Sequence, residues 1–182
     1  MYEKERELAE QSIKDWTSNE VFTFGWFLMV AIIIVAYAVW LKLVDRKRAT
    51  GLLLIGSLEA VAKLLFVAVL LDNILGVYDY QIRLLPVPAN VFATSVTLSP
   101  IIVMLVTQYT SSWKGFLLWE AIGNAFLNFV LFPIYTAVGI LEFHRGWNVF
   151  YHFLVLYAIA ICVRVVFLWI TGTQKRFQEK AG

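Results

Sequence analysis

The chain has 182 residues, of which 60% are hydrophobic and 15% are charged, and its mean hydropathy is +0.74. Soluble domains carry about a quarter charged and about half apolar residues, so this composition excludes a soluble fold and makes the lipid bilayer the expected partner. The net charge of +2 is spread between apolar blocks and gives no reason to expect nucleic acid. The single cysteine, Cys162, excludes an intrachain disulfide and a cysteine zinc site.

The N-terminal segment, residues 1–21, is an acidic tail. It lacks the basic start, apolar run and cleavage site of a signal peptide, so we expect it to be retained. Within it, Glu10 and Lys14 stand at helical spacing, which allows a short surface helix over residues 3–16. A solvated tail is the alternative, because the segment has few apolar anchors.

Five apolar runs follow, and crossing the hydrocarbon core takes about 20 helical residues. Hydrocarbon offers the backbone no hydrogen-bond partner, so runs of this length predict α-helices. Pro88 is expected to open the third run and Pro100 to kink it, with Ser95 or Ser99 able to meet the freed carbonyl. The fourth run could continue past Pro133. The sequence thus predicts an all-α polytopic transmembrane helix bundle over residues 22–171, with spans at 22–44, 51–71, 88–108, 113–133 and 147–171.

The basic residues predict an orientation, because lysine and arginine are enriched on the cytoplasmic side of membrane proteins. One side of the five spans would hold Lys4, Arg6, Lys14, Arg83 and Arg145, and the other would hold Lys42, Arg46, Lys47, Arg48, Lys114, Lys175, Arg176 and Lys180. The second side has more. The N-terminus is therefore expected outside, and residues 172–182 are expected to form a basic cytoplasmic tail.

Two charged residues lie in the second span, where a charge costs about 2.5–3.5 kcal/mol on insertion scales. Glu59 and Lys63 are four residues apart, in the order that the helix dipole favours, so they are expected to neutralise each other on one helix face. Two interpretations stay open: an ion pair that only packs between helices, or a site that handles a proton or an ion.

A polar stripe runs along the fourth span. Glu120, Asn124 and Asn128, with Tyr135 if the helix continues past Pro133, fall within an arc of about 80° at 100° per residue. Such a stripe must face protein or a water-filled cavity. Amides bonding across a packed interface are one explanation, and a polar cavity is the one we favour, because a carboxylate adds a desolvation cost that packing alone would avoid.

Arg164, in the fifth span, is the remaining buried charge candidate. Its long stem could snorkel to the cytoplasmic end of the helix. The sharper hypothesis pairs it with Glu120, which lies in the same half of the predicted bundle, and Glu59 is the competing partner.

Histidines near the fifth span raise the question of a metal site. The spacing of Glu142, His144 and His152 fits no recognised ligand pattern, and histidines in a loop and at a helix end are usually solvated, so we expect no metal and no cofactor. The sequence also contains no serine–histidine–acid set and no phosphate-binding glycine loop. Enzymatic activity is therefore not the favoured expectation.

Two short patterns carry a resemblance. They are Tyr80 followed by Leu84-Leu85-Pro86, and Gly146-Trp147-Asn148, separated by the span with Pro100 and by Trp119-Glu120. Over residues 78–170 the chain resembles an uncharacterised family of small multi-spanning membrane proteins of endospore-forming Firmicutes. The resemblance implies a bacterial plasma membrane and no particular activity.

The same resemblance directs attention to two outer corners, whose candidate residues are Tyr80, Arg83, Glu142, His144, Trp147 and Asn148. Gly146-Trp147-Asn148 can also be explained as a glycine turn, an interfacial ring and a helix cap.

Three functions are compatible with these features. The first is a bundle that binds or passes a small solute or proton at the intramembrane polar residues. The second is an enzyme acting on a lipid-like substrate, with Glu120 or Glu59 as general base, and the third is an accessory subunit of a membrane complex. Five spans are few for a self-contained carrier, so a homo-oligomer or a partner membrane protein is expected in the first case.

Overall fold

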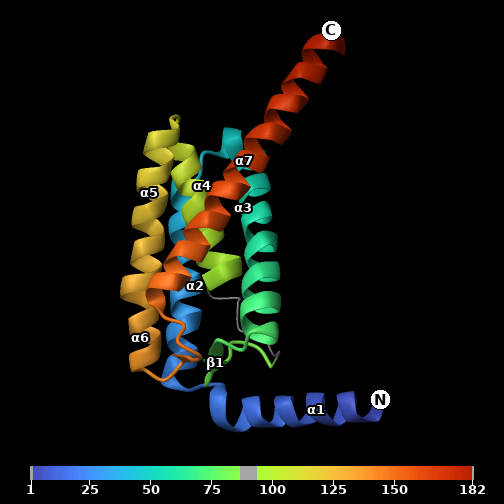
Figure 1. The fold of residues 1–182 in the computed structure, drawn as a ribbon, viewed down its shortest axis with the longest axis vertical. Helices are drawn as coiled ribbons and strands as arrows, with labels where there is room; N and C mark the ends of the chain where they lie inside the picture. Colours follow the sequence, from blue (N-terminus) through green and yellow to red (C-terminus); the bar gives the residue numbers. More distant parts are fainter. Residues whose placement is uncertain (1, 87–93, 182) are drawn as a thin grey trace.

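The computed structural model describes residues 2–86 and 94–181, and it is predominantly helical. Within these described residues, four helices are long and apolar enough to cross a membrane: Phe24–Leu43, Arg46–Leu71, Trp113–Ala137 and Val149–Gln174. A shorter apolar helix covers Thr94–Tyr109. Figure 1 shows these helices side by side in one bundle.

The helical elements follow the apolar runs along the chain. The α-helices are α1 (Tyr2–Asp15), α2 (Phe24–Leu43), α3 (Ala49–Lys63), α4 (Ser99–Tyr109), α5 (Trp113–Phe126), α6 (Phe132–Ala137) and α7 (Val149–Ala181). The π-helical segments are η1 (Trp16–Glu20), η3 (Leu64–Ile74), η4 (Thr94–Leu98) and η5 (Leu127–Leu131), and η2 (Arg46–Arg48) is a 3-10 turn. As predicted, the fourth apolar run continues through Pro133, because α5, η5 and α6 follow one another without a break.

The third predicted span is the short one. Its described helix, η4 with α4, begins at Thr94 and has a length of about 24 Å at 1.5 Å per residue, which is less than the hydrocarbon thickness of about 30 Å. The predicted start at Pro88 lies outside the described residues. Pro100 stands in the first turn of α4, and the π-helical η4 directly precedes it, so the helix is irregular where the proline predicted a disturbance.

A two-stranded ribbon closes one end of the bundle, and the sequence patterns did not predict it. Strand β1 (Tyr78–Tyr80) pairs antiparallel with β2 (Leu141–Phe143), with Tyr78 opposite Phe143. We call this end, which also carries α1, the ribbon end. The other, which carries η2 and the last residues of α7, is the basic-turn end (Figure 1).

The N-terminal segment forms the short helix that the sequence allowed, and most of its described side chains are exposed. Helix α1 lies across the ribbon end of the bundle (Figure 1). Two contacts hold the chain that follows it: the Trp16 indole donates a hydrogen bond of 2.9 Å to the Arg83 carbonyl, and the buried Glu20 carboxylate binds the Arg83 side chain. The sequence interpretation counted Trp16 only as an apolar residue of the helix and did not consider Glu20.

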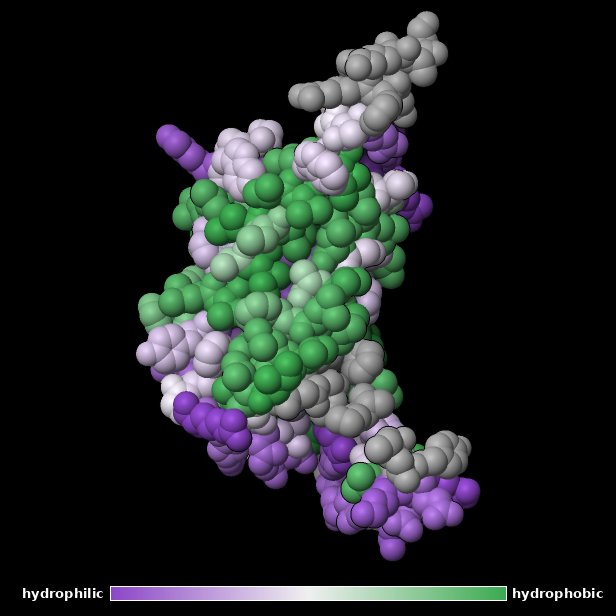
Figure 2. Space-filling model, turned by 45° about the vertical axis from the view of Figure 1, so that its right-hand side comes forward, coloured by the Kyte–Doolittle hydropathy of each residue, from purple (hydrophilic) through white to green (hydrophobic). Residues whose placement is uncertain are grey.

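The middle of the bundle has an apolar outer surface. Figure 2 shows hydrophobic residues covering the bundle between two more hydrophilic ends. Exposed large side chains such as Ile34, Leu118 and Trp169 contribute to this surface. An apolar area this extensive is not found on soluble monomers, so it supports the membrane protein that the composition predicts.

Two apolar clusters fill the interior, and glycines let the helices approach closely. A Cβ atom on Gly56 of α3 would lie 2.7 Å from the sulfur of Met104, and one on Gly123 of α5 would lie 2.5 Å from Ile102 of the α4 helix. Small residues at helix contacts are the usual means of close packing in membranes. The three helices α3, α4 and α5 are thereby drawn together around the polar residues described below.

The Glu20–Arg83 contact is expected to hold the N-terminal segment on the bundle. The carboxylate accepts from the Arg83 backbone N–H at 2.6 Å and from Nε at 3.0 Å, and this bonding raises the pKa of Arg83 above its usual range. Glu20→Ala removes charge-assisted bonds worth about 1.5–3 kcal/mol each to charged partners. We therefore expect a lower melting temperature in detergent and faster proteolysis of α1.

The matched control is Glu10→Ala. Glu10 pairs with Arg6 at 2.8 Å, but both side chains are more than half exposed, and exposed pairs contribute little to stability. Equal effects of the two substitutions would show that Glu20 does not anchor the N-terminal segment.

Candidate functional site

A buried ion pair connects α3 to α4. Lys63 Nζ lies 2.7 Å from Glu59 Oε1, and both side chains are fully buried. Lys63 also donates to the hydroxyl of Ser99, which in turn donates to Glu59 Oε1 at 3.2 Å. The pair predicted from the spacing is present, and Ser99 bonds to it rather than to the backbone carbonyl that Pro100 leaves free.

The polar stripe of α5 and η5 points into the bundle as predicted. Glu120, Asn124 and Asn128 are fully buried, and Tyr135 is 3% exposed. The Asn124 amide donates to Glu120 Oε1 at 2.8 Å and to the Glu120 carbonyl, and the Asn128 amide donates to the Asn124 carbonyl at 2.7 Å. Among the described residues, the hydrogen bonds of the stripe therefore run along its own helix, which does not match the interhelical amide bonding considered as one explanation.

The buried ion pair of α3 and the polar stripe of α5 and η5 are neighbours in the bundle. Glu120 lies within electrostatic reach of Lys63 and Glu59 from α3, and of Arg164 from α7. We call Glu59, Lys63, Ser99, Glu120, Asn124 and Asn128 the polar core cluster.

Each helix that supplies this cluster changes to π-helical geometry beside it. Segment η3 begins directly after Lys63, η4 ends directly before Ser99, and η5 contains Asn128. A π-helical turn widens the helix and frequently marks a functional site. The apolar periodicity of the sequence gave no sign of these changes.

Arg164 does not form the predicted ion pair. Its guanidinium lies over the Phe116 ring, 4.1 Å from the centroid, and 5.3 Å from that of Trp113. Among the described residues it makes no salt bridge to Glu120 or Glu59. The side chain is 4% exposed, so it has not snorkelled to water, and the aromatic faces stabilise the cation instead.

Several polar atoms of the cluster have no hydrogen-bond partner among the residues that the structure describes. They are Glu59 Oε2, Glu120 Oε2, Asn124 Oδ1 and Asn128 Oδ1, with Nε and Nη1 of Arg164 nearby. Leaving a buried polar atom unsatisfied costs about 1–3 kcal/mol. Four of these atoms are oxygens that accept, so the group lacking here is a donor or a positive charge: a proton, water or a small cationic or hydroxylated solute. Within residues 2–86 and 94–181, no group of three or more histidine, cysteine, aspartate and glutamate side chains could hold a metal ion.

The outer-corner residues lie on and beside the ribbon. Tyr80 ends β1, Glu142 is exposed in β2, and His144 lies 3.6 Å from Asp79. Asn148 caps α7 by accepting from the backbone N–H groups of Phe150 and Tyr151.

The turn before α7 has the glycine turn and the asparagine cap that were predicted as one explanation of Gly146-Trp147-Asn148. Gly146 has φ +74°, a conformation that favours glycine. The Trp147 backbone N–H donates to the His144 carbonyl at 3.0 Å. These corner residues build the turn, and they lie apart from the polar core cluster.

His152 is the residue whose environment the sequence interpretation got wrong. It was expected to be solvated, as histidines at helix ends usually are, yet it is 2% exposed and packed among aromatic rings. Its helical position one turn after Asn148, next to a run of aromatic residues, is the only sequence signal that could have indicated burial.

Comparison with protein-family models, with curated proteins and with solved structures found no match to this chain. The class of protein therefore follows from the chain itself. Its composition, its apolar surface and its four long apolar helices define a helical membrane protein with a closed polar centre.

The stability of the protein is expected to depend on both members of the buried Glu59–Lys63 ion pair. Removing one charge leaves the other unpaired, which typically costs about 3–5 kcal/mol, whereas replacing both by apolar residues is often neutral. We expect Glu59→Gln and Lys63→Met each to lower the melting temperature strongly, and the double variant Glu59→Leu/Lys63→Met to recover most of the loss. Thermal unfolding of the purified protein in detergent measures this, and additive losses in the double variant would show that the two charges do not depend on each other.

Proposed function

We propose that the protein binds or passes a proton or a small polar solute at the polar core cluster, inside the membrane. The observation that carries this proposal is the set of buried carboxylate and amide oxygens without donors in the middle of an apolar bundle. Ionisable groups at this depth are costly and are kept mainly where they act.

The two carboxylates of the cluster have different surroundings, which supports a division of roles. Glu59 is bonded to Lys63 and Ser99, so it is fixed as half of an ion pair. Glu120 accepts an amide hydrogen bond at one oxygen and, among the described residues, forms no ion pair; like Glu59, it keeps one oxygen without a partner there. Glu120 is therefore the group we assign to bind the proton or solute, and the Glu59–Lys63 pair holds the adjoining helices in position.

We infer five spans, with the ribbon end outside and the basic-turn end in the cytoplasm. The support is the basic turn Arg46–Arg48, which fits the rule that positive residues stay inside, and the position of η4 and α4 within the bundle (Figure 1). The resemblance over residues 78–170 favours a bacterial plasma membrane. Each cluster side chain is fully or almost fully buried, so passage requires a second, more open arrangement of the helices.

Glu120→Gln tests the proposal because it keeps the size and the amide contact of the side chain but removes its proton-binding carboxylate. We expect proton flux into proteoliposomes, followed with an internal pH dye, to fall at least tenfold. The control is Glu142→Gln, which changes an exposed carboxylate of β2 and should leave the flux unchanged. Wild-type flux no higher than that of protein-free vesicles, or unchanged flux in Glu120→Gln, would remove the cluster from this role.

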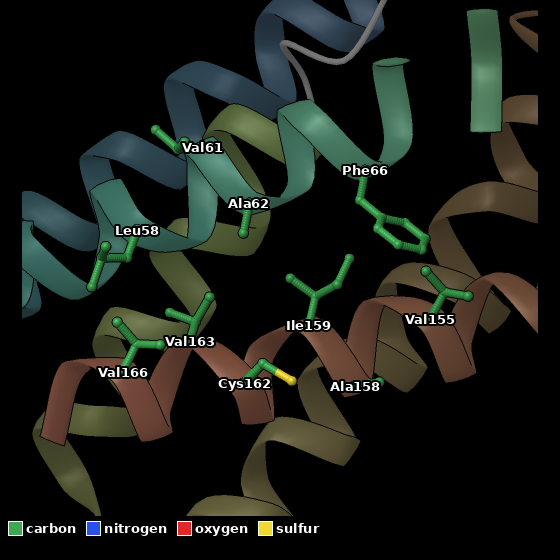
Figure 3. Close-up of a pocket in the computed structure, with 10 residues that line it drawn as sticks. All are labelled: Leu58, Val61, Ala62, Phe66, Val155, Ala158, Ile159, Cys162, Val163 and Val166. Carbon is green, nitrogen blue, oxygen red and sulfur yellow. The ribbon is translucent and has the colours of Figure 1, made fainter. Parts of the chain in front are cut away.

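We also propose, as a second function, that the protein is a subunit of a homo-oligomer. The observation that favours it is a groove between α3 and α7. Figure 3 shows apolar side chains from both helices facing each other across it. Its volume is about 570 Å³, and its lining residues include Ala62, Ala158 and Cys162. Ala158 and Cys162 are four residues apart on α7, a spacing of small residues that allows two helices to pack closely.

The native cysteine makes this second function testable without new labels. If α7 packs against α7 of a second copy at Ala158 and Cys162, oxidation of membranes with copper phenanthroline should give a disulfide-linked dimer. Ala158→Leu, which fills the groove, should reduce that dimer, and moving the cysteine out of the groove with Cys162→Ala/Leu168→Cys should abolish it. Absence of the dimer in the wild type would argue against pairing through this groove.

A further inference from the structure

His152 is buried in an aromatic cage at the ribbon end of the bundle. The centroid of its ring lies 4.6 Å from that of Phe132, 5.5 Å from that of Tyr78 and 6.2 Å from that of Phe143. Within residues 2–86 and 94–181, neither ring nitrogen has a hydrogen-bond partner. The hydroxyl of Tyr135, whose ring packs against Phe132, is also buried and has no partner in the same part of the chain.

One residue of the cage, Tyr78, also lines a polar pocket at the ribbon end. The pocket has a volume of about 500 Å³, and its lining includes Asp15, Glu20, Asp79 and Tyr78. Tyr78 therefore borders the pocket and also packs edge-on against His152. On the inner side, His152 lies within electrostatic reach of Lys63.

Packing alone does not account for a histidine here. A phenylalanine would fill the same aromatic cage and would bring no polar atom, whereas the imidazole buries two nitrogens that have no partner among the described residues, which is unfavourable. What imidazole adds is the ability to accept a proton at one nitrogen and to release another from the second. A buried polar group without partners calls for an explanation in function or in a transient contact.

We propose that His152 relays protons between the ribbon-end pocket and the polar core cluster, an inference that rests on the proposed proton-binding function. A hydronium ion in the pocket gives its proton to one ring nitrogen and remains as water, the ring becomes an imidazolium, and the proton on the other nitrogen passes by way of water toward the polar core cluster. A turn of the ring then restores the starting tautomer. The imidazolium is an intermediate of this relay.

Two arms test the relay. In the first, His152→Phe keeps the packing and removes both nitrogens, and we expect proton flux in proteoliposomes to fall at least tenfold with no loss of thermal stability. His144→Phe is the matched control, because His144 is the only other histidine of the chain and its side chain is 45% exposed; its flux should match the wild type. Equal flux in His152→Phe and the wild type would overturn the relay.

The second arm measures access to His152 without measuring transport. In a Cys162→Ala background, His152→Cys introduces the only cysteine, and a small membrane-impermeant thiol reagent is applied from either side of oriented vesicles. The relay predicts labelling at least tenfold faster from the ribbon side. Labelling that is absent or equal from both sides would overturn the route through the cage. Wild-type protein without proton flux but with ribbon-side labelling would overturn the proton function and support the route itself.

Discussion

Charges inside a membrane bundle must be neutralised locally, and the Glu59–Lys63–Ser99 contact is the interaction on which this bundle depends. The ion pair is fully buried, and Ser99 bonds to both of its members from the first turn of α4. In hydrocarbon neither charge could stand alone. The pair thus fixes the position of α4 against α3, and the glycine contact between Gly56 and Met104 allows the same two helices to approach.

The other residues of the polar core cluster, Glu120, Asn124 and Asn128, have fewer of their hydrogen-bonding atoms paired. The amides of Asn124 and Asn128 donate to their own helix, which leaves their oxygens and one oxygen of Glu120 directed at no partner. A bundle selected for stability alone would replace these groups by apolar residues, as buried polar groups usually cost more than they contribute. Their arrangement is one that a proton, water or small solute would complete.

The ribbon end gives the cluster a defined outer boundary. Strands β1 and β2 join segments that lie far apart in the sequence, and Glu20 attaches the N-terminal segment to Arg83. The aromatic cage of His152 lies next to this end, because Tyr78 of β1 packs against the histidine ring. The π-helical segments next to Lys63, Ser99 and Asn128 lie at the cluster itself.

Much of this could be predicted from the sequence. Run length and hydropathy predicted the helices, and the spacing of Glu59 and Lys63 predicted their ion pair, because contacts within one helix follow from its period. The same period placed Glu120, Asn124, Asn128 and Tyr135 on one buried face. The link through Ser99, the stacking of Arg164 on Phe116 and the Glu20–Arg83 bond could not be predicted, because each joins residues of different elements.

The sequence by itself determined that the chain is helical and suited to a membrane, and which side chains are too polar for hydrocarbon. Only the tertiary structure decided which of them meet. Helical periodicity fixes the direction of a side chain relative to its own axis, whereas the partner of that side chain depends on how the helices rotate and cross. That choice is made by packing across the bundle, which no single segment encodes.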